Sequence, residues 1–259
     1  MKPNAGALLR KWLRRKSWVC QPINLSGVTD PYQPIEKKLR LTRDCLQVAI
    51  EHNQPIYIIT KNALVARDLD LLTELKQKNL VHVIMTVTSL DQSLTRILEP
   101  RTSSPTARLQ AIAKLTENEI PVRVNIAPII VGLNEHEVPE VLKQAAAAGA
   151  VTASYTVLRL PGAVESVFLD WVKQHFPDRL EKIENGIRQM SGGELINREF
   201  FDRMRGTGVL ADHVRNTFKT FANKYGLNKV RTQLSVDHFR VPLRVSKGDP
   251  RQRTLFDDA

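Results

Sequence analysis

Apolar runs bounded by turn-forming residues recur along the chain and predict five strands. Between two of them, apolar residues spaced by three and four indicate an amphipathic helix that includes Ile35, Leu39, Leu46 and Ile50. Strands that alternate with helices are typical of a parallel α/β sheet or barrel. The predicted strands cover residues 22–28, 55–60, 80–88, 121–127 and 151–160.

Most of these strands have one apolar and one polar face. Val81, Val83 and Val87 alternate with His82 and Thr86, and residues 122–126 and 151–157 repeat the pattern. A packed barrel interior would not accommodate so many polar groups without partners. We therefore expect helices on the apolar face and an open, ligand-holding cavity on the polar face. An antiparallel sheet with one solvated face is the alternative.

The alternation of strands and helices ends near residue 161. Helical segments are predicted at about 165–189 and 210–225, followed by a basic tail in which residues 242–253 have the composition of disordered chain. The sequence thus divides into a basic helical lead-in, a barrel-like body, a helical extension and a tail. Their expected ranges are 1–20, 21–162, 163–235 and 236–259.

The charge is concentrated at the two ends. Residues 1–16 hold six Lys or Arg and no acid, and residues 198–253 hold thirteen against five acids, in a chain of net charge +11. Basic flanks on a neutral body fit a partner that carries phosphate groups, although ordinary solvation explains them equally well. No apolar run approaches the roughly 18 residues of a membrane span, so we expect a cytoplasmic protein that does not enter membranes. The two cysteines, Cys20 and Cys45, have no metal-ligand spacing.

The turn after the first predicted strand gathers polar residues. Pro34 and Glu36 suit the start of a helix, so the stretch reads first as a strand-to-helix connection. That interpretation leaves unexplained a polar cluster at the carboxyl end of a strand, where α/β folds place their ligands. The cluster consists of Thr29, Asp30, Tyr32 and Gln33.

Several motifs in order along the chain resemble the radical S-adenosylmethionine (radical SAM) superfamily, in the branch related to spore photoproduct lyase and DNA repair photolyase-like proteins. They are SGVTDPYQPIE, ITKNALVARDLDLL, TVTSLD, LEPRTSSPTARLQAI, APIIVGLNEHE and TVLRLP. The resemblance implies a six-unit (βα) half-barrel, SAM and a 4Fe-4S cluster as cofactors, and cleavage of SAM to a 5′-deoxyadenosyl radical for lyase chemistry on DNA.

The resemblance also implies roles for individual residues. Thr29 and Asp30 match positions that contact the methionyl amino group of SAM, and Lys61 matches a lysine that pairs with its carboxylate. Thr86 and Asn125 match contacts to the methionyl part or ribose. Ile130 and Gly132 belong to the segment whose backbone abuts adenine, in which Pro128 replaces the first glycine of the family pattern, and Arg159 would face the cofactor or a substrate phosphate.

Each of these residues also has a structural explanation. Lys61 and Arg159 could neutralise acids at the rim, Thr86 could be present for its β propensity, and Asn125 could cap a loop. A further alternative is an ordinary α/β barrel lyase in which Lys61 forms a Schiff base and Asp30 assists it.

The departure from the family pattern is the absence of CxxxCxxC. In the family the first βα unit supplies three thiolates to the cluster, whereas this sequence has five predicted strands and two separated cysteines. We expect a partial half-barrel without its first βα unit, an unpaired strand edge at 22–28, and no SAM cleavage by this polypeptide alone.

The end of the sequence carries one further motif. Gln252, Leu255 and Phe256 form QxxLF, which is similar to the tail motif with which bacterial repair and replication proteins dock on the sliding clamp. A non-catalytic module that binds nucleic acid or the clamp is therefore an alternative to a truncated radical SAM enzyme.

Overall fold

The computed structural model describes residues 2–26, 28–190, 204–229 and 233–242. Its centre is one parallel sheet with strands in chain order, β1-β2-β3-β4-β5. This arrangement confirms the predicted parallel α/β architecture and rules out the antiparallel alternative. The strands are β1 (Ile23–Leu25), β2 (Ile56–Thr60), β3 (Val81–Thr86), β4 (Val122–Ile129) and β5 (Thr152–Val157).

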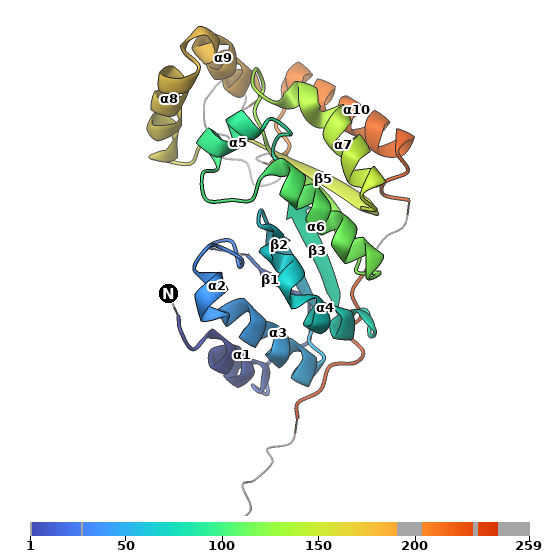
Figure 1. Cartoon of the computed structure of the whole chain (residues 1–259). Coiled ribbons are helices and arrows are strands. Elements are labelled where there is room, and N and C mark those ends of the chain that lie inside the picture. The colour runs from blue at the N-terminus through green and yellow to red at the C-terminus, as the bar shows by residue number, and fades with distance from the viewer. Residues whose placement is uncertain (1, 27, 191–203, 230–232, 243–259) are drawn as a thin grey trace, which may run out of the picture.

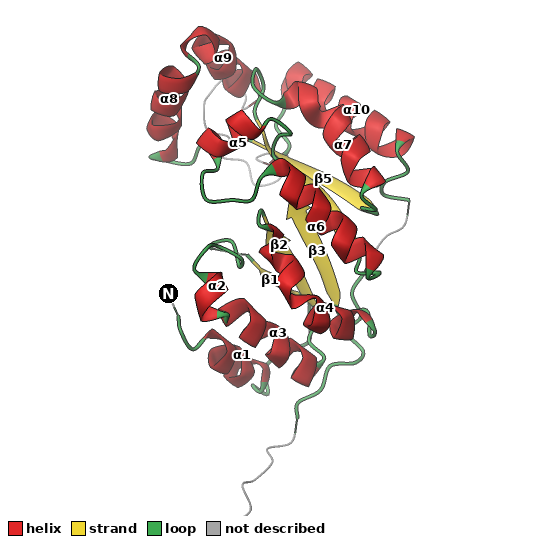
Figure 2. Ribbon diagram, in the orientation of Figure 1, coloured by secondary structure: helices red, strands yellow, loops and turns green. Residues whose placement is uncertain are grey.

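Helices cover one face of this sheet (Figures 1 and 2). The core between the two layers contains Val81, Val83 and Met85 of β3 together with Val122 and Val124 of β4, all less than 1% exposed. The predicted apolar faces of the strands are therefore the buried ones. The covering helices are α3 (Leu41–His52), α4 (Leu69–Lys76), α6 (Pro105–Glu117) and α7 (Val138–Ala147).

Shorter elements shape the carboxyl ends of the strands. One such element follows each of the strands β1, β2, β3 and β4, in that order, and turns the chain back toward the covering helices. They are α2 (Glu36–Leu39), the 3-10 helix η1 (Ala63–Asp68), α5 (Gln92–Leu98) and the 3-10 helix η2 (Glu135–Glu137). The first helix, α1 (Ala5–Leu13), packs against α3 before β1 begins.

The helical extension is broken by a proline. A single predicted span at 165–189 divides into α8 (Val164–His175), the 3-10 turn η3 (Pro177–Arg179) and α9 (Leu180–Met190), because Pro177 lacks an N–H and cannot continue α8. The last helix, α10 (Gly208–Lys224), packs against α7 and α9.

Residues 233–242 run along the amino-terminal ends of the strands. The N–H of Ser235 donates to the carbonyl of Asn79 (3.0 Å), and the N–H of Arg240 donates to that of His52 (2.8 Å). Figure 1 shows this orange-red segment passing from the region of α10 toward α3. The first residues of the expected flexible tail are thus bonded to the body.

The two edges of the sheet differ. At the β5 edge, Asn228 donates its N–H to the carbonyl of Val151 and accepts from the N–H of Ala153 through its side chain. At the β1 edge, the strand pairs only with β2 in the part of the chain that the structure describes. Among the described residues, β1 is therefore an edge strand.

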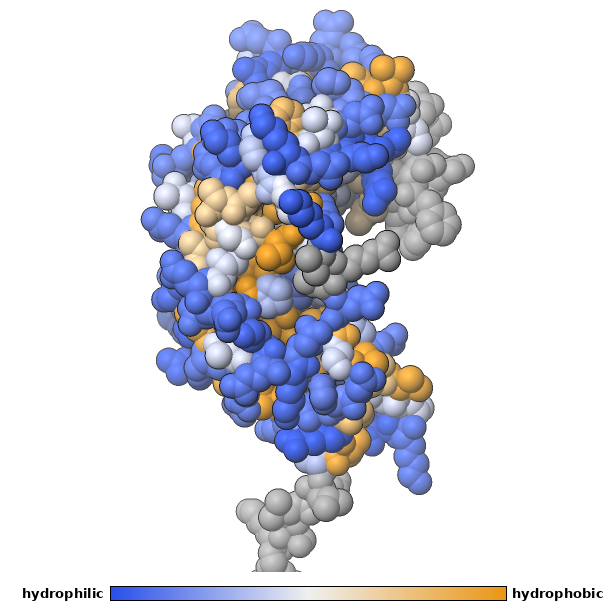
Figure 3. All heavy atoms as spheres, turned by 90° about the vertical axis from the view of Figure 1, so that its right-hand side faces the viewer, coloured by the Kyte–Doolittle hydropathy of each residue, from blue (hydrophilic) through white to orange (hydrophobic). Residues whose placement is uncertain are grey.

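The face of the molecule drawn in Figure 3 is mostly hydrophilic. The face in Figure 3 carries hydrophobic side chains in smaller groups among polar ones, in keeping with a mean hydropathy of −0.26. No helix in the described part of the chain is long and apolar enough to cross a membrane.

Candidate functional site

Asp30 holds the turn after β1 against the end of β2. One carboxylate oxygen accepts hydrogen bonds from the N–H of Tyr32 (2.8 Å) and the hydroxyl of Thr60 (2.7 Å), and the other accepts from the N–H of Lys61 (2.7 Å). A carboxylate that receives three donors fixes local geometry strongly. Asp30 therefore has a structural role. Its contact with SAM stays a prediction.

Tyr32 anchors the same turn from the other side. Its ring is fully buried, and its hydroxyl donates to Asp68 (3.1 Å). Burial, followed by the negative charge of Asp68, raises the pKa of Tyr32 well above its ordinary value. Thr29, in contrast, is exposed. Of the four polar residues in this turn, Asp30 and Tyr32 are thus explained by the fold, and Thr29 is available to a ligand.

Lys61 directly follows β2 and is already engaged. Its ammonium forms an ion pair with Glu99 and donates to the hydroxyl of Thr88 (3.3 Å) and the carbonyl of Ala127 (3.1 Å). These acceptors match the three N–H groups of the ammonium. A SAM carboxylate, or a carbonyl that forms a Schiff base, would have to displace one of them.

Glu99 has a second cationic partner, Arg108 of α6, which sequence reasoning missed. The Arg108 guanidinium donates to Glu99 (2.7 Å) and to the backbone carbonyls of Thr86 (3.0 Å) and Ser103 (2.8 Å), and its side chain is 1% exposed. Burial alone would raise the pKa of Glu99, but the charges of Lys61 and Arg108 outweigh it and hold that pKa below its usual value. This network joins the carboxyl ends of β2, β3 and β4.

The polar face of the sheet carries a pocket of about 440 Å³. Asn125 lies in it and accepts a hydrogen bond from the hydroxyl of Ser154 (3.0 Å). Asn125 also pairs in register with Thr86 of β3, a residue that is 2% exposed. The lining residues come from all five strands: Asn24, Tyr57, Ile59, Ile84, Arg123, Asn125 and Ser154.

His82 lies on the same face as this pocket, beside Tyr57, with 5.9 Å between ring centroids. Burial and the nearby charge of Arg123 lower the pKa of His82 to about 4. The imidazole is therefore neutral at neutral pH.

The segment after β4 is packed rather than open. Ile130 is fully buried, and its N–H donates to the side chain of Asn134 (2.7 Å). Gly132 has φ +88°, and a Cβ there would lie 3.2 Å from Ile183 of α9. Both residues thus position the loop, whose backbone is the part that the resemblance assigns to adenine.

The remaining predicted residues lie apart from this group. Arg159 is exposed two residues after β5, with Nη1 3.4 Å from the sulfur of Met204. Gln252, Leu255 and Phe256 lie outside the described residues. The structure therefore places Asp30 beside Lys61 at the carboxyl end of β2, and Asn125 beside Thr86 at the carboxyl end of β3. Within the described ranges, no hydrogen bond or ion pair joins Arg159 to these four residues.

Residues 8–145 match the family model described as the radical SAM superfamily. The chain belongs to the radical SAM superfamily. The sequence resemblance is thereby confirmed at the level of the superfamily, and the five-stranded parallel sheet with its covering helices is the corresponding partial barrel.

Relatives with similar sequences are uncharacterized. Protein Rv2578c of Mycobacterium tuberculosis is 32% identical over 184 residues, which cover 70% of this chain and 54% of the relative. Protein MJ0683 of Methanocaldococcus jannaschii is 36% identical over 115 residues, covering 44% and 43%. The chain spans about half the length of these relatives.

The fold is also similar to that of spore photoproduct lyase. One mutant of that enzyme superposes with a TM-score of 0.55 at 16% identity, covering 86% of this chain and 64% of the enzyme. Another, with bound AdoMet and dinucleoside spore photoproduct, gives 0.53 at the same identity and coverage. At this identity the likeness concerns the fold.

The printed chain does not fit a 4Fe-4S cluster. It contains only Cys20 and Cys45, and no group of three potential metal ligands occurs in the described ranges. Burial raises the pKa of both thiols, that of Cys45 to about 11, and this opposes the thiolate form that iron requires. A pocket of SAM-compatible size with amide, hydroxyl and guanidinium donors is present, so the described residues do fit SAM.

Proposed function

We propose that this chain forms the SAM-binding part of a radical SAM lyase that acts on DNA, and that a segment outside the printed sequence supplies the cluster thiolates. The observation that supports it most directly is the polar pocket on the inner face of a radical SAM sheet, around Asn125. In this family SAM supplies the radical chemistry. The role proposed for the residues described here is to bind and orient SAM.

Asn125 and Ser154 are the residues proposed to meet the polar atoms of SAM. The amide of Asn125 can both donate and accept, which suits ribose hydroxyls or the edge of adenine. Since Ser154 already holds this amide at 3.0 Å, its orientation is fixed before a ligand arrives. Lys61 is proposed to form an ion pair with the methionyl carboxylate of SAM, which would compete with Glu99 for the ammonium.

The thiolate-bearing segment is proposed to dock along β1. This edge strand has pairing groups on its outer side, and a parallel strand added there would extend the sheet toward six strands. Val19 and Val28, which precede and follow β1, are 80% and 101% exposed, so apolar side chains are exposed before and after the docking strand.

DNA is proposed as the substrate class from charge and fold. The net charge of +11 suits a polyanion, and spore photoproduct lyase, whose fold is similar, has been seen with a dinucleoside spore photoproduct.

Equilibrium dialysis with labelled SAM tests the pocket. We expect the chain to bind SAM, the variant Asn125→Ala to bind it several-fold more weakly, and Asn223→Ala, an exposed residue of α10, to leave binding unchanged. Equal binding by the two variants would contradict the assignment of the pocket.

Co-expression tests the complete activity. The chain is produced with a separate CxxxCxxC-bearing segment taken from a longer relative, and the purified complex is assayed anaerobically for SAM cleavage. Cleavage by the complex, with none by either part, supports the proposal. A stable complex that contains a cluster and fails to cleave SAM would refute it.

A further inference from the structure

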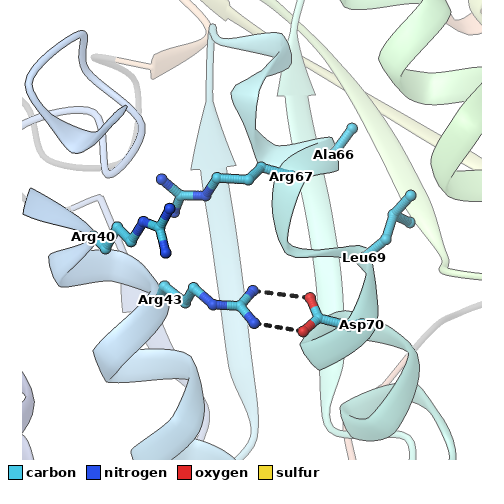
Figure 4. A pocket seen from close by; sticks show the side chains of 6 residues that line it. All are labelled: Arg40, Arg43, Ala66, Arg67, Leu69 and Asp70. Carbon is cyan, nitrogen blue, oxygen red and sulfur yellow. Dashed lines mark hydrogen bonds and ion pairs between the residues drawn. The ribbon is translucent and has the colours of Figure 1, made fainter. Parts of the chain in front are cut away.

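A second pocket, of about 470 Å³, shares no lining residue with the pocket around Asn125. It is formed where α2 meets α3 and where η1 meets α4. Its wall includes three arginines, and Figure 4 shows the side chains of Arg40 and Arg67 extending toward each other across it. The lining residues are Arg40, Arg43, Ala66, Arg67, Leu69 and Asp70.

Two of the arginines are held in place by carboxylates. Arg43 binds Asp70 with two hydrogen bonds and Asp68 with a third (3.0 Å). Arg67 donates to Asp68 through Nε (2.9 Å) and Nη2 (2.8 Å) and to the side chain and carbonyl of Glu36. Each guanidinium has five N–H groups, so both keep donors that these bonds do not use.

Arg40 is different because its charge is not compensated. Its side chain is exposed, and no hydrogen bond or ion pair involves it within the described ranges. It therefore adds a free guanidinium to a pocket in which the other two are already oriented.

The backbone of Arg40 is also unusual. Its φ of +52° lies in the left-handed region at the junction of α2 and α3. Glycine or asparagine adopts this conformation more readily, and the Cβ of other residues makes it unfavourable. Backbone strain of this kind is concentrated at ligand-binding sites and turns, and the residue that carries it here lines the pocket.

We propose that this pocket binds a phosphodiester group of DNA. Guanidinium groups in a fixed arrangement match the geometry of phosphate oxygens. The guanidinium groups would bind the oxygens of inorganic phosphate equally well. The choice of DNA as the ligand therefore rests on the proposed function. The β1 turn connects this pocket to the carboxyl end of β2. Tyr32 donates to Asp68, a partner of Arg43 and Arg67, and Asp30 accepts from the N–H of Lys61.

Fluorescence anisotropy with a short labelled duplex tests the pocket. We expect Arg40→Ala to weaken binding and to reduce the slope of log K against log salt by about 1, the change for one lost phosphate contact. Arg40→Lys retains the charge and should keep most of the slope. The control Arg215→Ala removes an exposed arginine of α10 that pairs with Asp212, and should change neither quantity.

Arg40→Gly separates binding from folding. It removes the guanidinium and relieves the left-handed backbone, so it should raise the melting temperature while it weakens DNA binding. Wild-type binding by Arg40→Ala and Arg40→Gly, or equal losses in Arg215→Ala, would overturn the proposal. Displacement of the duplex by polyglutamate as readily as by inorganic phosphate would also overturn it, in favour of an acidic peptide site.

The outcomes distinguish this proposal from the function on which it rests. If Arg40 variants lose DNA binding while the cluster-bearing complex does not cleave SAM, the phosphate site stands and the lyase function fails. If SAM is cleaved and Arg40 variants bind DNA normally, or if the chain binds no DNA, the phosphate site fails.

Discussion

Glu99 accepts a 2.7 Å hydrogen bond from Arg108, and the two side chains are 6% and 1% exposed. Through Lys61, Thr88 and the carbonyl of Thr86, this ion pair connects the carboxyl ends of β2 and β3. The carboxyl ends of parallel strands are where α/β folds bind ligands. The pair therefore makes the rim of the candidate SAM site a fixed structure.

Arg108→Met should lower the free energy of unfolding by about 3 kcal/mol, because Glu99 then loses its most buried partner. The control Arg188→Met breaks the exposed pair with Glu184 on α9 and should cost less than about 1 kcal/mol. Urea denaturation of both variants checks the difference. Similar losses in both would show that the buried pair contributes no more than a surface pair.

Asp30→Asn should destabilise the turn by about 1–3 kcal/mol, because an amide presents only one of the two oxygens that Asp30 uses. Faster hydrogen exchange at the Lys61 N–H would locate the effect. Asp178→Asn, at an exposed position of η3, is the control and should leave stability unchanged. If Asp30→Asn instead weakens SAM binding at unchanged stability, the ligand role implied by the resemblance would be favoured over the structural one.

The sheet was predictable because its signals are local. Alternation of apolar residues such as Val83 with polar residues such as His82 identifies a strand and the face that each residue occupies, and turn residues mark the strand ends. The family motifs placed Lys61 and Thr86 near the ends of two strands, and in the structure Lys61 follows β2 and Thr86 ends β3.

The partners of these residues were not predictable, since they come from distant parts of the chain. Lys61 meets Glu99, 38 residues away, and Tyr32 meets Asp68, 36 residues away. Nothing in the local pattern around Arg108 distinguishes it from an exposed helix residue, yet it is buried. Only the packing of α6 against the strand ends brings its guanidinium to a carboxylate.

His82 should make the protein less stable in mild acid. Its pKa is about 4 in the folded state and 6.5 without the fold, so the unfolded chain takes up a proton that the folded chain does not. The contribution of neutral His82 to the free energy of unfolding is thus fully present above about pH 6.5. It falls by up to about 3 kcal/mol as the pH approaches 4. Nuclear magnetic resonance should find the His82 ring neutral at pH 5.

The variant His82→Gln isolates this contribution. Its free energy of unfolding should change less between pH 7 and pH 5 than that of the parent, by about 2 kcal/mol. An identical pH dependence in parent and variant would mean that His82 is not the group responsible.

Anaerobic reconstitution of the printed chain with iron and sulfide should give no 4Fe-4S cluster and no SAM cleavage. Two cysteines with raised pKa values, 25 positions apart, cannot supply the three thiolates that leave a fourth iron open. The double variant Cys20→Ser, Cys45→Ser should therefore carry as little iron as the parent, measured chemically beside the visible absorbance of the cluster. A brown parent protein whose colour disappears in the double variant would show that these thiols ligate iron, and the separate thiolate-bearing segment would then be unnecessary.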